Sequence, residues 1–126
     1  MEVVPYIHHV QMAIPPNSED IARYFFSSLL GLPEIAKPAQ LQSRGGVWLQ
    51  TGNLQLHLGV EMDFQPARKA HVAFLVSDID LIRERLALAG LPTVDDEPLA
   101  GYVRFYTNDP FGNRIELVAI DKSLLQ

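Results

Sequence analysis

Three histidines and one glutamate occupy matched positions in two copies of one sequence pattern. The first copy offers His9 and His57, and the second offers His71 and Glu116 at the equivalent places. Imidazole and carboxylate groups together suit Zn, Ni, Fe and Mn alike. The pattern therefore predicts one divalent metal site that takes ligands from both copies, with the identity of the metal left open.

The repeat covers nearly the whole chain. Each copy begins with His-Val, continues with Gly-Leu-Pro and ends with Gly-Asn followed by an alternating run. In the first copy these segments are His9-Val10, Gly31-Leu32-Pro33 and Gly52-Asn53. In the second copy they are His71-Val72, Gly90-Leu91-Pro92 and Gly112-Asn113. The hydrophobic periods predict the order βαβββ in each copy, which is an α+β fold class. Strands are expected over residues 6–14, 34–37, 46–51 and 54–60, and over residues 70–76, 93–95, 101–107 and 114–119.

One helix is expected in each copy, between its first and second strands. Asn17 or Ser18 can cap the first helix, whose predicted buried stripe is Ile21, Phe25 and Leu29. Ser77 or Asp78 can cap the second helix, which is expected to bury Ile79, Ile82, Leu86 and Ala89. Residues 61–69 are the predicted linker between the copies.

Alternation along each strand decides which side chains share a face. Val10, Met12 and Ile14 form the apolar bed for the first helix, so His9 and Gln11 point the other way. The same reasoning places His57, His71 and Glu116 on faces away from the helices, and it excludes His8, which has the opposite parity. If the two copies curl toward each other, these faces line one cavity.

The bulk composition narrows the classes of function. A chain of 126 residues with 48% hydrophobic residues is expected to form one compact domain. The absence of cysteine excludes disulfides and thiolate metal sites. A net charge of −5 argues against nucleic-acid binding. The sequence shows no secretory signal and no run long enough to span a membrane, which together fit a cytoplasmic protein.

The chain resembles the vicinal oxygen chelate superfamily of glyoxalase I, bleomycin-resistance proteins and extradiol dioxygenases. The resemblance covers about residues 6–120 and is carried by His9-Val10, Leu56-His57-Leu58, His71-Val72-Ala73-Phe74 and the run from Asp109 to Leu117. It implies a single domain, residues 1–126, with module one at about 6–60 and module two at about 70–120. The modules would form a cupped, barrel-like sheet of eight strands with helices outside. It also implies that His9, His71 and Glu116 hold a divalent ion, with His57 at the variable fourth position.

This resemblance leads to the expected function. We expect a small glyoxalase-like metalloenzyme that acts on an oxygen-chelating metabolite by lyase, isomerase or dioxygenase chemistry, with Glu116 as the catalytic base. The expected substrate-binding residues are Gln11, Trp48, Gln50, Tyr102, Arg104 and Tyr106. Arg44 and Arg104 could meet an anionic substrate, and a homodimer is expected because the sheets leave exposed edges.

Two other functions stay open at this point. The chain could sequester a drug or metabolite without chemistry, as bleomycin-resistance proteins do, or it could be a domain with a degenerate site and a structural role. Gln11 stands where fosfomycin-modifying members usually carry Thr, and His57 stands where glyoxalase I usually carries Glu. The chain is also shorter than most extradiol dioxygenases.

Overall fold

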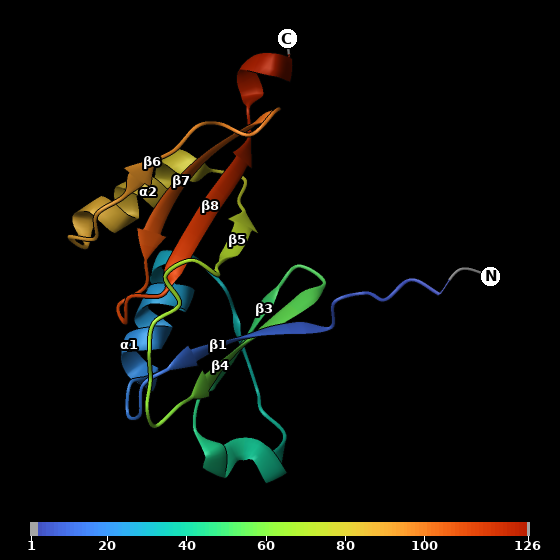
Figure 1. Cartoon of the computed structure of the whole chain (residues 1–126), viewed down its shortest axis with the longest axis vertical. Coiled ribbons are helices and arrows are strands. Elements are labelled where there is room, and N and C mark those ends of the chain that lie inside the picture. The colour runs from blue at the N-terminus through green and yellow to red at the C-terminus, as the bar shows by residue number, and fades with distance from the viewer. Residues whose placement is uncertain (1–2, 126) are drawn as a thin grey trace. The chain divides into compact units, whose positions relative to one another are not determined.

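The chain divides into two compact units that carry the same fold. The structure, a computed structural model, describes residues 3–125, and the division falls between Gln65 and Pro66, inside the predicted linker. Figure 1 shows the helices and strands of both units. Among residues 3–125, no helix is long and apolar enough to cross a membrane.

Unit 1 is a four-stranded mixed sheet with one helix packed on it. Its elements are β1 (His9–Ile14), α1 (Glu19–Arg23), the π-helical segment η1 (Tyr24–Leu29), β2 (Glu34–Ile35), the 3-10 helix η2 (Ala39–Arg44), β3 (Val47–Thr51) and β4 (Leu54–Val60). The strand order is β1-β4-β3-β2. The first strand β1 runs parallel to β4, and the other neighbours are antiparallel.

Unit 2 repeats this topology strand for strand. Its elements are β5 (Val72–Leu75), α2 (Ile79–Leu88), β6 (Val94–Asp95), β7 (Tyr102–Asn108), β8 (Arg114–Ile120) and the 3-10 helix η3 (Lys122–Leu125). The order is β5-β8-β7-β6, again with the first strand parallel to the last. The predicted α+β class built from two βαβββ modules is therefore confirmed.

The predicted buried stripe of the first helix is wrong at one position. Ile21 is 55% exposed, whereas Ala22, Phe25 and Phe26 are fully buried and Leu29 nearly so. After Arg23 the helix widens to π-type bonding, as in the bond from the Leu30 amide to the Phe25 carbonyl. The wider turn brings both phenylalanines to the sheet. In the second helix Asp78 is the cap, and its side chain accepts from the Leu81 amide at 3.0 Å.

The first strand is shorter than the sequence pattern predicts. The alternation begins at Tyr6, but β1 begins only at His9, opposite Gln55. Its partner β4 begins at Leu54, so residues before His8 have no strand to pair with. A strand requires a partner for its backbone groups, and the alternation of side chains alone cannot show where that partner begins.

The run from Asp109 to Arg114 is a structural element of unit 2. Asp109 Oδ1 accepts from the amides of Phe111 and Asn113 at 2.9 Å each, and Asp109 Oδ2 accepts from Asn113 Nδ2 at 2.8 Å. Asn113 Oδ1 in turn accepts from the Ala67 amide at 2.9 Å. Both side chains are buried. Burial raises the pKa of Asp109, and the hydrogen bonds from Asn113 oppose that rise. The motif thus ties the segment before β5 to the β7–β8 turn.

We predict that Asn113→Ala destabilises the protein far more than Asn53→Ala. The first change leaves the Ala67 amide and Asp109 Oδ2 without their partners, at a cost of about 1–3 kcal/mol for each group. Asn53 follows glycine at the equivalent place in the first repeat, but it is exposed. Urea denaturation of the two variants measures the difference. Equal losses in the free energy of unfolding would show that the motif carries no special structural role.

Candidate functional site

In unit 1, three aromatic rings stack on the face of the sheet turned away from the helix. The register places Trp48 opposite His57 on β3 and Gln11 opposite His57 on β1. The Trp48 and His57 rings lie 3.8 Å apart at 1°, and the His57 and His9 rings lie 4.3 Å apart at 15°. Leu56 and Leu58, on either side of His57 in β4, are buried. The face predicted for His9 and His57 is therefore confirmed, and the two side chains lie together.

The protonation of His57 follows from its neighbours. The ring is 5% exposed, and its Nε2 lies 2.9 Å from Gln55 Oε1. Because an amide oxygen can only accept, Nε2–H is the donor and Nδ1 keeps a free lone pair. Burial, followed by the charges of His9, His8 and Lys37, lowers the pKa of His57. A neutral imidazole with a free nitrogen is the form that binds metals.

His8 lies beside His9, although strand parity excluded it. The two Nδ1 atoms are 2.9 Å apart, and the ring centroids are 5.2 Å apart in an edge-to-face arrangement. Parity applies only within a strand, and β1 begins at His9, so parity does not fix the direction of the His8 side chain. His8, His9 and His57 all line one pocket of unit 1, which has a volume of about 450 Å³.

Several lining residues of this pocket come from the connection before β3, where the sequence singled out only Arg44. They are Lys37, Leu41, Arg44 and Gly45, and they join Gln11, Trp48 and Gln55 from the sheet. Gln11 lies over Gly59, where an added Cβ would come 2.7 Å from Gln11 Nε2. Gln50, predicted to bind substrate, donates from Nε2 to the Gly52 carbonyl at 2.7 Å and so serves the β3–β4 turn.

Two glycines fix the end of that connection against the sheet. Gly46 has φ +89, and a Cβ there would lie 2.2 Å from the Leu58 carbonyl oxygen. Its amide donates to Glu19 Oε2 at 2.9 Å, and this bond is the main reason that the pKa of Glu19 is lowered. Lys37 Nζ donates to the Gly45 carbonyl. These contacts hold the end of η2, and with it Arg44, beside the pocket.

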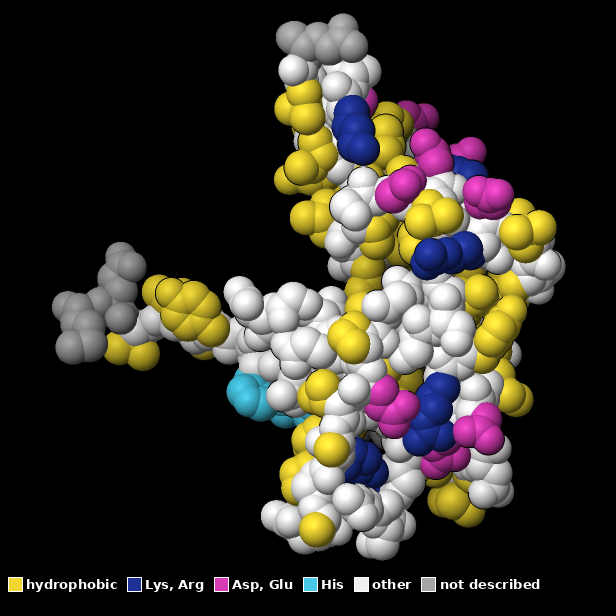
Figure 2. All heavy atoms as spheres, turned by 180° about the vertical axis from the view of Figure 1, so that it is seen from behind, with side chains coloured by type: hydrophobic (Ala, Val, Ile, Leu, Met, Phe, Trp, Pro, Cys, Tyr) yellow, Lys and Arg dark blue, Asp and Glu magenta, His cyan; other side chains and the backbone are white. Residues whose placement is uncertain are grey.

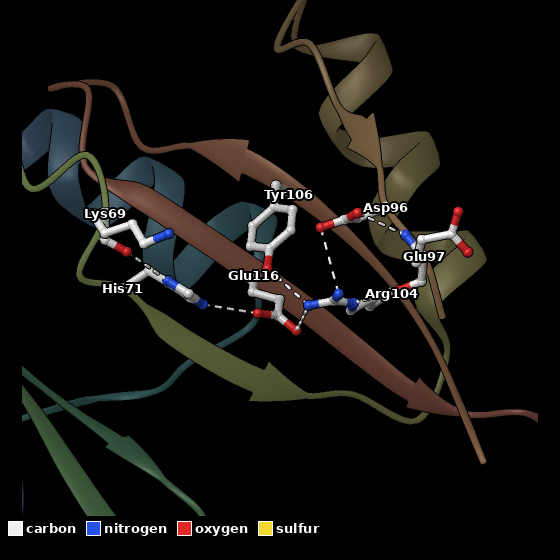
Figure 3. Close-up of polar contacts among 7 residues, drawn as sticks. All are labelled: Lys69, His71, Asp96, Glu97, Arg104, Tyr106 and Glu116. Carbon is white, nitrogen blue, oxygen red and sulfur yellow. Dashed lines mark hydrogen bonds and ion pairs between the residues drawn. The ribbon is translucent and has the colours of Figure 1, made fainter. Parts of the chain in front are cut away.

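In unit 2, His71 and Glu116 form the second predicted pair. His71 Nε2 lies 2.8 Å from Glu116 Oε1, and His71 Nδ1 lies 2.9 Å from the Lys69 carbonyl oxygen (Figure 3). The carbonyl requires Nδ1–H to donate, so in a neutral ring Nε2 is an acceptor that faces a carboxylate oxygen. At this distance the two atoms share a proton, and a bound metal ion would take the place of that proton. Glu116 is 4% exposed, and a buried carboxylate needs such a partner.

Arg104 and Tyr106 lie on the other side of Glu116 (Figure 3). Arg104 Nη1 donates to the Tyr106 hydroxyl at 2.8 Å and lies 3.5 Å from Glu116 Oε2. The guanidinium also donates from Nε to the Glu97 carbonyl and pairs with Asp96 at 3.4 Å. Glu116 therefore forms an ion pair with Arg104 as well as its contact with His71.

The aromatic rings around Glu116 are also held in place. The guanidinium of Arg114 lies 3.8 Å from the centre of the Tyr106 ring, and His71 meets the same ring edge-on at 5.4 Å. The register of β7 and β8 places Tyr102 further along the same face, opposite Ile120, and it is 39% exposed. Tyr106 and Arg104 are therefore close to Glu116, whereas Tyr102 lies two residues beyond Arg104.

Each unit thus holds one pair of predicted ligands, which we call a half-site. The half-site of unit 1 is His9 with His57, and that of unit 2 is His71 with Glu116. In the part of the chain that the structure describes, no three His, Asp or Glu side chains form a group that could hold a metal ion. A complete site would require ligands from both half-sites.

The fold and the paired half-sites define a class of proteins, and known structures identify it. A glyoxalase family protein from Bacillus anthracis is 42% identical over 96% of this chain and 99% of its own, with a TM-score of 0.89. The chain belongs to the glyoxalase family, within the vicinal oxygen chelate superfamily. No protein-family model matches the chain, and no curated protein matches it.

Two more distant structures share the fold. A glyoxalase/dioxygenase from Nostoc punctiforme is 20% identical over 95% of this chain and 97% of its own, with a TM-score of 0.76. The fosfomycin resistance protein FosX from Listeria monocytogenes is 16% identical over 93% of this chain and 94% of its own, with a TM-score of 0.74. At these identities the similarity concerns the fold alone.

We predict that Gly46→Ala destabilises the protein more than Gly31→Ala. Both glycines have φ near the same positive value, +89 and +86, so both changes carry a backbone strain of about 1–2 kcal/mol. Only at Gly46 would the new methyl group also collide with a backbone carbonyl, whereas nothing lies within 4 Å of a Cβ at Gly31. Thermal and urea unfolding measure both variants. A Gly31→Ala variant as unstable as Gly46→Ala would contradict the close packing on Leu58.

We also predict that Glu19 contributes to the loss of stability in acid. Its folded pKa is lowered from the ordinary value of 4.5, so its contribution is complete above that value and is lost as the pH falls through the folded pKa. Glu19→Gln should therefore be less stable at neutral pH and show a smaller fall in stability in acid. Glu61→Gln, at an exposed residue, should keep the wild-type pH profile. If the two variants show the same dependence of stability on pH, the hydrogen bond from the Gly46 amide to Glu19 does not contribute to the loss of stability in acid.

Proposed function

We propose that this protein is a small metalloenzyme in which His9, His57, His71 and Glu116 hold one divalent ion. The observation that carries the proposal is the contact of 2.8 Å between His71 Nε2 and Glu116 Oε1, which brings two predicted donor atoms to one point. The repeat supplies a second pair at the equivalent strand positions. The proposed site joins the half-sites of both units, either within one domain spanning residues 1–126 or between two chains of a homodimer.

The donor groups fit a divalent ion of the first transition series. Imidazole with a single carboxylate suits Zn, Ni, Fe and Mn, and no thiolate is needed. In unit 2 the Lys69 carbonyl fixes Nδ1–H of His71, which directs Nε2 toward Glu116. A hydrogen bond on the second ring nitrogen is the usual way in which a metal-binding histidine is oriented. In unit 1 the lowered pKa of His57 favours the neutral ring that a ligand requires.

The proposed reaction belongs to the lyase, isomerase or dioxygenase chemistry of oxygen-chelating substrates. A bound ion would act as a Lewis acid on two adjacent substrate oxygens. Glu116 is the only carboxylate among the four ligands, so it is the group that could take a proton from the substrate and return it. Arg104 and the Tyr106 hydroxyl, 2.8 Å apart, can donate toward a developing negative charge. Trp48 and Gln11 are the proposed substrate-binding residues of unit 1.

The alternative function, in which the protein sequesters a drug or metabolite without chemistry, would need a pocket suited to that ligand. A cationic drug of the bleomycin type prefers an acidic groove, but the described residues that line the unit 1 pocket include no Asp or Glu. Its lining instead carries five basic side chains, which are His8, His9, Lys37, Arg44 and His57. The cationic side chains of Lys37 and Arg44 disfavour a cationic drug in this pocket.

We predict that wild-type protein purified without chelator retains about one divalent ion per chain, because structural and catalytic sites of this donor type bind tightly at neutral pH. Removing the ion should lower the melting temperature by several degrees, since ligand at ~100-fold over its dissociation constant stabilises the native state by about 2.7 kcal/mol. Glu116→Gln should lose both the metal and the effect of chelator, because it removes the only anionic ligand.

The matched control is Glu84→Gln, which removes the same charge from an exposed position of α2. It should retain the metal and the wild-type response to chelator. Elemental analysis and thermal melts with and without chelator provide the measurements. If the untreated wild type holds no metal and its melt does not respond to chelator, the metalloenzyme proposal fails and sequestration without metal takes its place.

A further inference from the structure

The pocket of unit 1 concentrates positive charge in a protein that is acidic as a whole. The chain has 15 acidic and 10 basic residues and a net charge of −5. The pocket nevertheless brings together two cationic side chains, Lys37 and Arg44, with three histidines and, among the described residues that line it, no carboxylate. On the face shown in Figure 2, exposed histidine side chains lie apart from the acidic ones. This imbalance is the starting point for an inference about the ligand.

Two of the five basic side chains have no role in metal binding. Lys37 and Arg44 flank the 3-10 helix η2, and neither forms an ion pair with an acidic side chain in residues 3–125. The Lys37 ammonium donates to the Gly45 carbonyl, and Gly46 is anchored to Glu19 and packed on Leu58. The protein thus fixes the backbone that carries Arg44 while leaving its guanidinium available.

Aromatic and apolar side chains also line the pocket. Trp48, His57 and His9 form one stack in which His57 lies between the other two rings, and Leu41 adds an apolar side chain from η2. The face of Trp48 that is turned away from His57 is not used in the stack, and it favours a ligand with a planar body, because planar groups stack on aromatic faces. A guanidinium favours a carboxylate, which it can bind through two parallel hydrogen bonds.

We propose that this pocket binds a small organic acid, with its carboxylate at Arg44 and Lys37 and its planar body against the ring of Trp48. The inference names the substrate class of the proposed enzyme, and it rests on that proposed function. A carboxylate-bearing substrate would reach the pocket beside His9 and His57. Its remaining oxygens would then lie toward the proposed metal ligands of unit 1.

The single tryptophan of the chain makes the proposal measurable. Trp48 lines the pocket, so its fluorescence should change when a ligand binds there. The probes are benzoate, which has a planar body and a carboxylate, and benzamide, which has nearly the same shape without the charge. The measurements use full-length protein treated with chelator, so that no metal contributes to binding.

Benzoate is expected to bind at least about tenfold more tightly than benzamide, as one hydrogen bond to a charged group would provide. Arg44→Gln should remove about this factor for benzoate and leave benzamide unchanged. The matched control Arg68→Gln removes the same charge from an exposed residue of unit 2 and should bind both probes like the wild type. Inorganic phosphate should bind at least about tenfold more weakly than benzoate, since it has no planar body to stack.

Equal binding of benzoate and benzamide by the wild type would overturn the proposal, and so would equal effects of Arg44→Gln and Arg68→Gln on benzoate. Phosphate that binds as tightly as benzoate would overturn the assignment to an organic acid. Metal content separates this proposal from the proposed function. Arg44→Gln should hold as much metal as the wild type, because Arg44 is not a predicted ligand. A protein without metal that still selects benzoate would refute the enzyme and retain the acid pocket.

Discussion

Parallel pairing of the first and last strand in each unit determines where the functional side chains lie. In unit 1 it sets Gln11 beside His57, and in unit 2 it sets Ala73 beside Glu116, at the centre of each sheet. The helix covers one face, so every second residue of these strands points to the other face. A shift of one residue in either register would bury His57 or Glu116 under the helix and expose leucines in their place. The requirement for an apolar core thus enforces the position of the polar site.

Burying the charged side chain of Glu116 on this face of the sheet has an energetic cost. A carboxylate that is 4% exposed needs compensation, and it receives a contact of 2.8 Å from His71 and a longer one of 3.5 Å from Arg104. Arg104 is itself shared with Asp96, the Glu97 carbonyl and the Tyr106 hydroxyl, so it neutralises Glu116 only in part. Removing one partner of a buried charge is more costly than the net gain from forming the pair. His71 and Arg104 together therefore provide a partner for each oxygen of the buried carboxylate.

Sequence reasoning predicted the repeated elements and the faces of the four ligands, because both follow from local periodicity. It failed at the start of β1, where the alternation continues past the point at which the partner strand begins, and at Ile21, which is exposed in α1 before the π-type segment. It also missed Lys37, whose connection has no periodic pattern. The nearest signal was Gly45-Gly46, which marks a turn but not the surface that the turn packs on. Arg44 was noticed as a charge, but only the packing of Gly46 on Leu58 explains its place.

The run from Asp109 to Asn113 and the two half-sites have different roles, so they differ in what they indicate about a reaction. The run from Asp109 to Asn113 is satisfied internally and with Ala67, so it marks the fold and carries no chemistry. Chemistry must come from the half-sites and their surroundings. Four proposed ligands with a single carboxylate would leave a divalent ion with a net positive charge, and the basic residues of the unit 1 pocket add to it. A site of this kind gains most from an anionic substrate, because the substrate then supplies the negative charge that the ligands lack.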